Sequence, residues 1–314
     1  MKFFFRDLHV VLDLTPNYVT AADKDLQNAL KEDPEALSAF VTTKTQNVNN
    51  WKKVGGSGTA WKTEGKTFFL SQFGENYDLQ MSSPFAQNKL LGVINHLAGM
   101  GVKGFRLNNA KFLVINQALK DEVVNSESHK NKDDYEFYRH GETVYQPELS
   151  EIIHKFSRAV YNATDGEGFL TIRDDVGVRA EVFASNHSTI LGFDLPRFVF
   201  LNHFLKPSES EIPKKLHNGF EHLKGLIDIS TIWMQVVYKP DQFKVDDGLD
   251  ASAYNMFMSL LPGVQIVPFG ALNYAENKTD IIKKLEEARE SQVFQHGKFN
   301  HLLSVNATAF GYTR

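Results

Sequence analysis

Two adjacent carboxylates are the residues whose placement most clearly permits chemistry in this chain. Asp174 and Asp175 follow the apolar run Phe169–Ile172, which we expect to be a strand. A carboxyl group at a strand end can act as an acid in catalysis when it is protonated. The pair also fits a turn with two solvated carboxylates, and we favour that interpretation. Asp13 stands inside another apolar run, where burial of its charge is costly unless it is hydrogen-bonded.

Metal and thiol chemistry find no support in the sequence. The chain has no cysteine, which excludes disulfides, thiolate metal sites and a cysteine nucleophile within it. His9, His96 and His154 lack the spacing of metal ligands, and we expect each of them at the surface or in the core. We therefore predict no metal ion and no cofactor.

Charge and targeting signals narrow the class of partner. The 314 residues carry a formal net charge of −4, so nucleic acid is not an expected partner. No signal peptide is recognisable, because the apolar start Met1–Phe5 is too short. No run approaches the roughly 20 apolar residues of a membrane helix. Four Asn-X-Ser/Thr sequons indicate an extracellular setting and are candidate glycosylation sites: Asn162, Asn186, Asn277 and Asn306.

The elements that must position these residues alternate between strands and helices, as in a parallel α/β sheet or barrel. Ser83-Pro84 begins the clearest helix, and Gly99 ends it. The polar stretch Thr20–Gly65 shows no clear alternation of helices and strands, which predicts an insertion between two elements of the sheet or barrel. The other expected strands are His9–Leu14, Phe68–Phe73, Val102–Leu107, Thr189–Phe193, Ile232–Val237 and Val264–Phe269, and the other expected helices are Pro147–Tyr161, Leu249–Leu261 and Thr279–Ser291.

The number of strands leaves two architectures open. About six strands of the parallel type are expected, whereas a closed (β/α)8 barrel has eight. The chain is therefore either a doubly wound sheet or a barrel without its first two strands.

Six motifs decide between these architectures. In chain order they are Val10–Tyr18, Asn49–Trp61, Phe69–Phe73 with Asp78-Leu79, Gly101–Leu107, Tyr145–Glu148, and Leu261–Gly263 with Phe269-Gly270. Together they resemble the α-amylase superfamily (glycoside hydrolase family 13), and in particular its maltase or α-glucosidase-like members. The resemblance implies a (β/α)8 TIM-type barrel that lacks its first two strands. It places barrel strand 3 in residues 1–18, an inserted small domain in 19–80, strands 4–8 in 81–294 and the start of a C-terminal β-domain in 295–314.

The same resemblance implies that the reactive positions of the family have changed. The nucleophilic aspartate is replaced by Asn108, and the acid glutamate by Ile172. Tyr18 replaces a histidine, and Ala271-Leu272 stand where the family has two acidic residues. The family's histidine–aspartate pair near strand seven is also missing. We therefore expect a pseudoenzyme without catalytic residues.

Other positions keep the family's residues without its chemistry. Arg106 matches the substrate-site arginine, and we expect it to form a structural pair. Asn17 is a further vestigial position, and Asp13 is expected to be a scaffold residue. Trp51 and Trp61 could form a platform for a sugar ring, but packing of the inserted domain is the favoured interpretation.

One inactive branch of the superfamily fits best. Val11–Tyr18 resembles the third strand of the heavy-chain subunits of heteromeric amino-acid transporters, of invertebrate type. This resemblance implies a multi-pass light chain as partner and a place at the extracellular face of the plasma membrane, as part of a longer single-pass protein. Two alternatives stay open: an α-glucosidase that uses Asp174 or Asp175, and a carbohydrate-binding pseudoenzyme.

Overall fold

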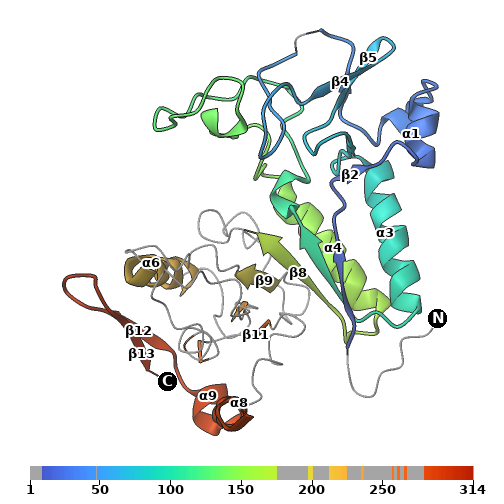
Figure 1. The fold of residues 1–314 in the computed structure, drawn as a ribbon. Coiled ribbons are helices and arrows are strands. Elements are labelled where there is room, and N and C mark those ends of the chain that lie inside the picture. The colour runs from blue at the N-terminus through green and yellow to red at the C-terminus, as the bar shows by residue number, and fades with distance from the viewer. Residues whose placement is uncertain are drawn as a thin grey trace. The chain divides into compact units, whose positions relative to one another are not determined.

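The structure, a computed structural model, forms two compact units (Figure 1). The first comprises Met1–Ile172 and Glu181–Pro196, and the second comprises Arg173–Ala180 and Arg197–Arg314. The structure describes residues 9–46, 48–174, 197–200, 212–224, 235–236, 257, 260–261, 265–266 and 279–313. In this described part, no helix has the length and apolar character needed to cross a membrane.

A parallel sheet organises the first unit. Strands β1 (Val11–Leu14), β7 (Gly104–Asn108) and β8 (Phe169–Asp174) lie in that order, and β1 pairs with β7 in parallel. A Cβ on Gly104 would lie 3.0 Å from Val11 and from the Phe169 ring, so the close approach of the three strands requires glycine there. These positions confirm the three strands that the sequence predicted.

Two long helices accompany these strands, α3 (Pro84–Gly99) and α4 (Leu149–Ala163) (Figure 1). Ser83 is the N-cap of α3 and Pro84 lies in its first turn, as the sequence predicted. The buried face of α4 includes Ile152, Phe156 and Val160, whose spacing matches the period of a helix. The two helices pack against each other.

The polar stretch after β1 contains more structure than the sequence suggested. It forms the short helices α1 (Lys24–Ala29) and α2 (Pro34–Leu37), each capped by an aspartate side chain. Strands β3 (Thr42–Thr43), β4 (Trp61–Glu64) and β5 (Thr67–Leu70) form an antiparallel sheet, and β2 (Tyr18–Val19) pairs with β6 (Tyr77–Asp78). The boundaries predicted for an inserted domain, 19–80, stay a prediction, as do the other domain boundaries.

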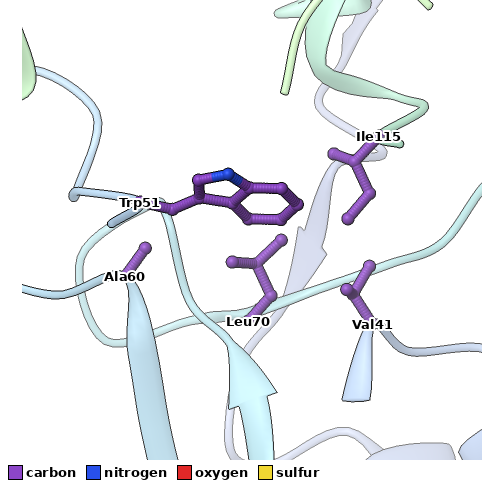
Figure 2. Packing of buried hydrophobic residues seen from close by; sticks show 5 residues of the cluster. All are labelled: Val41, Trp51, Ala60, Leu70 and Ile115. Carbon is purple, nitrogen blue, oxygen red and sulfur yellow. The ribbon is translucent and has the colours of Figure 1, made fainter. Parts of the chain in front are cut away.

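An apolar cluster around Trp51 holds this stretch together (Figure 2). The Trp51 ring packs with Val41, Ala60, Leu70 and Ile115, which come from distant parts of the first unit. Ile115 lies just after the 3-10 helix η1 (Ala110–Phe112), and a second 3-10 helix, η2 (Tyr135–Phe137), lies further along. The cluster therefore links the antiparallel sheet to the loop that follows β7.

The second unit is described in separate pieces. They are the strands β9 (Arg197–Phe200), β10 (Gln235–Val236) and β11 (Gln265–Ile266), the helices α6 (Ile212–Lys224), α8 (Thr279–Glu290) and α9 (Gln292–His296), and the antiparallel hairpin β12 (Asn300–Leu303) and β13 (Phe310–Thr313). Phe220 of α6 packs against Phe299 and Phe310 beside and on the hairpin. The predicted helix Thr279–Ser291 is confirmed. The predicted strand Thr189–Phe193 and most of the predicted helix Leu249–Leu261 lie outside the described residues.

Candidate functional site

An ion pair joins the two strands that carry the predicted site. Arg106 of β7 lies directly opposite Asp13 of β1, and its Nε and Nη2 atoms donate to the two carboxylate oxygens of Asp13. The Asp13 side chain is 44% exposed and that of Arg106 23% exposed. Arg106 forms a structural pair, as the sequence predicted. Its partner Asp13 is exposed and not buried, so its charge also keeps contact with water.

Two carboxamides, those of Asn17 and Asn108, lie where β1 and β7 end. Asn108 donates from Nδ2 to the hydroxyl of Thr15, over 3.3 Å, and Asn17 donates to the carbonyl of Asn109 over 2.8 Å. Asn109 adopts a left-handed backbone with φ of 54°, which asparagine tolerates. The Oδ1 atoms of Asn17 and Asn108 are buried and accept no hydrogen bond from the described residues. The site thus presents neutral amide groups with unused acceptors.

The structure describes the other predicted positions only in part. Ile172 is fully buried in β8, so its position offers an aliphatic surface and no proton donor. The ring of Tyr18 lies 5.3 Å from that of Phe73. Asp174 is the last residue of β8, as expected for a strand end. The side chain of Asp174, the whole of Asp175 and the pair Ala271-Leu272 lie outside the described residues.

The remaining sequence predictions also have clear outcomes. Trp51 is 1% exposed and stacks on Trp61, with 5.9 Å between the ring centres, so packing is confirmed and an open sugar platform is wrong for Trp51. His9 and His96 are exposed, and His154 is buried, as predicted. The sequons at Asn186 and Asn277 lie outside the described residues. Asn162 lies in the last turn of α4, and Asn306 lies in the exposed turn between β12 and β13.

Sequence reasoning missed a buried carboxyl group in the first unit. Asp78 is 4% exposed and accepts a hydrogen bond from the Gln72 amide nitrogen at 3.1 Å. Burial raises the pKa of Asp78 to about 7, which places its titration near neutral pH. The sequence analysis noted Asp78 only as part of the motif Phe69–Phe73 with Asp78-Leu79, and that motif does not indicate that the Asp78 side chain is buried.

A second buried carboxyl group, also missed, organises the loop after β7. Glu122 is 5% exposed and accepts from the Glu142 amide nitrogen at 3.2 and 3.1 Å and from the Thr143 hydroxyl at 2.8 Å. Burial raises the pKa of Glu122. Nearby, His140 stacks on Tyr135 with 3.5 Å between the ring centres, and burial lowers the pKa of His140 to about 4. These contacts hold the loop after β7 in one conformation, and we assign them a structural role.

Comparison with known proteins adds a family and a fold. Residues 2–193 match the family described as "Alpha amylase, catalytic domain". The salivary alpha-glucosidase of Aedes aegypti is 27% identical over 175 residues, which are 50% of this chain and 30% of that protein. The salivary alpha-glucosidase of Anopheles gambiae is 25% identical over 130 residues, which are 40% of this chain and 22% of that protein. The chain therefore matches less than a third of the length of these relatives.

Solved structures resemble the chain at lower identity. One is an alpha-glucosyl transfer enzyme with a TM-score of 0.67 and 17% identity, covering 84% of this chain and 52% of that one. Another is the trehalose-6-phosphate hydrolase of Bacillus licheniformis, with a TM-score of 0.64 and 17% identity, covering 90% of this chain and 55% of that one. These likenesses show a fold of the (β/α)8 type and decide against the doubly wound sheet.

Proposed function

The chain belongs to the α-amylase family of glycoside hydrolases, and from this premise we propose that it is a non-catalytic member that acts as a scaffold. One observation carries the proposal: Asn108, at the end of β7, stands where the family resemblance places the catalytic nucleophile. Retaining glycosidases need two carboxyl groups, one of which attacks the anomeric carbon. A neutral carboxamide is a very poor nucleophile, so Asn108 cannot carry out the attack on the anomeric carbon.

The surroundings of Asn108 support the same interpretation. The side chain of Ile172, at the position of the family's acid, is fully buried and is aliphatic, so it cannot deliver a proton. Arg106 is held by the carboxylate of Asp13. Removing a nucleophile alone lowers the rate by several orders of magnitude, and the remaining groups do not restore it.

We further propose that the scaffold is the heavy-chain subunit of an amino-acid transporter, part of a longer single-pass protein at the extracellular face of the plasma membrane. Val11–Tyr18 supports this role because it resembles the heavy-chain form of the third strand, with Tyr18 in place of histidine. The partner is then a multi-pass light chain. The same proposal includes a barrel that lacks its first two strands in this chain and carries an inserted small domain after strand 3.

Two measurements test the proposal. The full-length protein is expressed in the membranes that contain its candidate light chain and is purified in detergent. Co-purification of one multi-pass protein supports the scaffold role, and its absence where both proteins are expressed contradicts it. In parallel, release of glucose from maltose and from a nitrophenyl α-glucoside is measured. Turnover comparable to that of an active α-glucosidase would contradict the non-catalytic role.

A second candidate function is favoured by the two mosquito relatives, both of which are salivary alpha-glucosidases. An active enzyme would need displaced carboxylates, and Asp174 and Asp175 are the candidates. Hydrolysis that is lost in both Asp174→Asn and Asp175→Asn variants would support it. Hydrolysis that is unchanged in both variants would point to a contaminating enzyme.

A further inference from the structure

A long loop of the first unit has no hydrophobic core of its own. It runs over residues 116–148, between Ile115 and helix α4, and the structure describes all of it. Val123 and Val124 of this loop are 65% and 48% exposed. The side chains that the loop buries are all polar, and they are Glu122, Thr143 and Gln146. The loop therefore gains little from the hydrophobic effect, which is the main favourable contribution to folding.

Asn50 makes the main attachment of this loop to the rest of the unit. Its Nδ2 donates to the Glu122 carbonyl at 2.8 Å, and its Oδ1 accepts from the Glu122 amide nitrogen at 2.7 Å. The Asn50 amide nitrogen also donates to the carboxylate of Asp121 at 2.8 Å. One carboxamide thus satisfies both backbone groups of Glu122, as a neighbouring strand would do.

A second attachment lies further along both segments. The Gly58 amide nitrogen donates to the Asp133 carbonyl at 2.8 Å, and the Tyr135 amide nitrogen donates to the Gly56 carbonyl at 2.9 Å. These are backbone bonds of the kind that join antiparallel strands. Segment 49–58 therefore holds the loop at two places.

The two attachments are connected within the loop itself. The Asn125 amide nitrogen donates to the Phe137 carbonyl at 2.8 Å, and the Arg139 amide nitrogen donates to the Val123 carbonyl at 2.9 Å. The Glu122 carboxylate accepts hydrogen bonds from the far end of the loop, as described above. The outgoing and returning parts of the loop thus lie side by side, so release of one attachment weakens the other.

The loop also covers one edge of the Trp51 cluster. Trp51 donates from Nε1 to the Lys120 carbonyl at 2.8 Å, and Leu119 packs against the cluster. The Asn49 side chain donates to the Leu119 carbonyl at 3.1 Å. Since Trp51 is only 1% exposed, removal of this cover would open the edge of its ring to water.

We propose that residues 116–143 form a strap that opens as one cooperative unit while the rest of the first unit stays folded, and that Asn50 controls this opening. A segment with few buried apolar groups, held by hydrogen bonds near solvent, opens at a lower free-energy cost than a core helix or strand. Opening separates the strap from segment 49–58 and uncovers Trp51. The proposal does not depend on the scaffold role.

Hydrogen exchange of the full chain, followed by mass spectrometry of its peptides, tests the proposal. In wild type, the hydrogen-bonded amides of residues 119–125 and 133–139 should have equal protection factors, lower than those of α3. Asn50→Ala removes both side-chain bonds to Glu122 and should speed exchange in both parts of the strap by about 5- to 100-fold, the value of two neutral hydrogen bonds. Exchange in α3 should stay unchanged.

Two further variants complete the test. Asn28→Ala, at an exposed position of α1, is the matched control and should exchange as wild type. Asn50→Asp keeps the acceptor for the Glu122 amide but loses the donor, and it serves if Asn50→Ala does not fold. Faster exchange in residues 119–125 alone would show that the strap is not one unit. Equal acceleration in α3, or none in the strap, would also overturn the proposal.

Discussion

Arg106 and Asp13 face each other across neighbouring parallel strands and are joined by two parallel hydrogen bonds. The two strands start from segments 93 residues apart, so the pair ties the first strand of the unit to the strand after α3. The pair uses two of the five N–H donors of the guanidinium and fixes its orientation toward β1. The pair is thus a structural tie at a position where the family resemblance expects a substrate contact.

We expect Arg106→Gln to lower the free energy of unfolding by about 0.5–1.5 kcal/mol, because the pair is bidentate but partly exposed. Asp13→Asn should cost a similar amount. In a double-mutant cycle by urea unfolding, the combined variant should lose less than the sum of the two single losses. Strict additivity of the two effects would show that the pair contributes nothing to stability.

Ile172→Glu tests whether an acid can be restored in β8. The substitution places a carboxyl group where the side chain is fully buried, and we expect a loss of about 3–5 kcal/mol in unfolding free energy. Ile172→Val, the matched control, should cost only about 0.5–1.5 kcal/mol. Combining Asn108→Asp with Ile172→Glu should therefore give a destabilised protein without glucosidase turnover. A stable, active double variant would contradict the assignment of Ile172 to the core.

The elements of the fold were predicted best where local signals were strong. Helix α3 was found because Ser83-Pro84 and Gly99 mark its ends, and β7 because a short apolar run follows two glycines. Helices α1 and α2 were missed, because helices of 6 and 4 residues are too short to show a period.

The candidate site was predicted less completely, because burial depends on tertiary contacts. The positions Asn108, Ile172 and Arg106 came from motifs. A structural pair was expected for Arg106, but its partner Asp13 was identified only by the structure. The burial of Asp78 and Glu122 could not be read from their sequence neighbours. Glu122 accepts hydrogen bonds from Glu142 and Thr143, which lie on a later part of the loop, and Asp78 lies on β6, which pairs with the distant β2.

Trp51 should be the most sensitive aromatic residue of the first unit. Its ring is 1% exposed, and its Nε1 donates to the Lys120 carbonyl at 2.8 Å. We expect Trp51→Ala to cost about 3–5 kcal/mol, and Trp51→Phe less, because it keeps most of the apolar surface. Urea unfolding followed by far-UV circular dichroism measures both. Equal costs for the two variants would show that the cavity does not determine the loss.

Glycosylation in a secretory host should distinguish two of the sequons. The Thr164 hydroxyl of the Asn162 sequon is buried, donates to the Val160 carbonyl and accepts from the Gly168 amide nitrogen. In the Asn306 sequon, Thr308 donates to the exposed Asn306 side chain at 2.7 Å. We expect glycopeptide mass spectrometry to find a glycan at Asn306 and little at Asn162. Asn306→Gln should then remove the modification, whereas Asn162→Gln should leave it unchanged.

The buried carboxyl of Asp78 should make stability depend on pH. Its pKa rises from 3.8 to about 7 on folding, so the folded state binds the proton more tightly than the unfolded state. The resulting stability is fully present below the unfolded pKa and is lost as the pH rises through the folded pKa. Wild type should therefore lose on the order of a few kcal/mol between pH 4 and pH 8 through this group.

Asp78→Asn replaces the acid with a neutral side chain of the same shape and should remove this part of the pH dependence. Relative to wild type, the variant should gain stability at pH 8 and gain little or none at pH 4. The control is Asp165→Asn, an exposed position with φ of 55° that asparagine tolerates, and it should follow the wild-type profile. Urea unfolding across this pH range measures all three proteins. If Asp78→Asn keeps the wild-type slope, Asp78 does not titrate in this range, and its carboxylate is stabilised by contacts stronger than its burial.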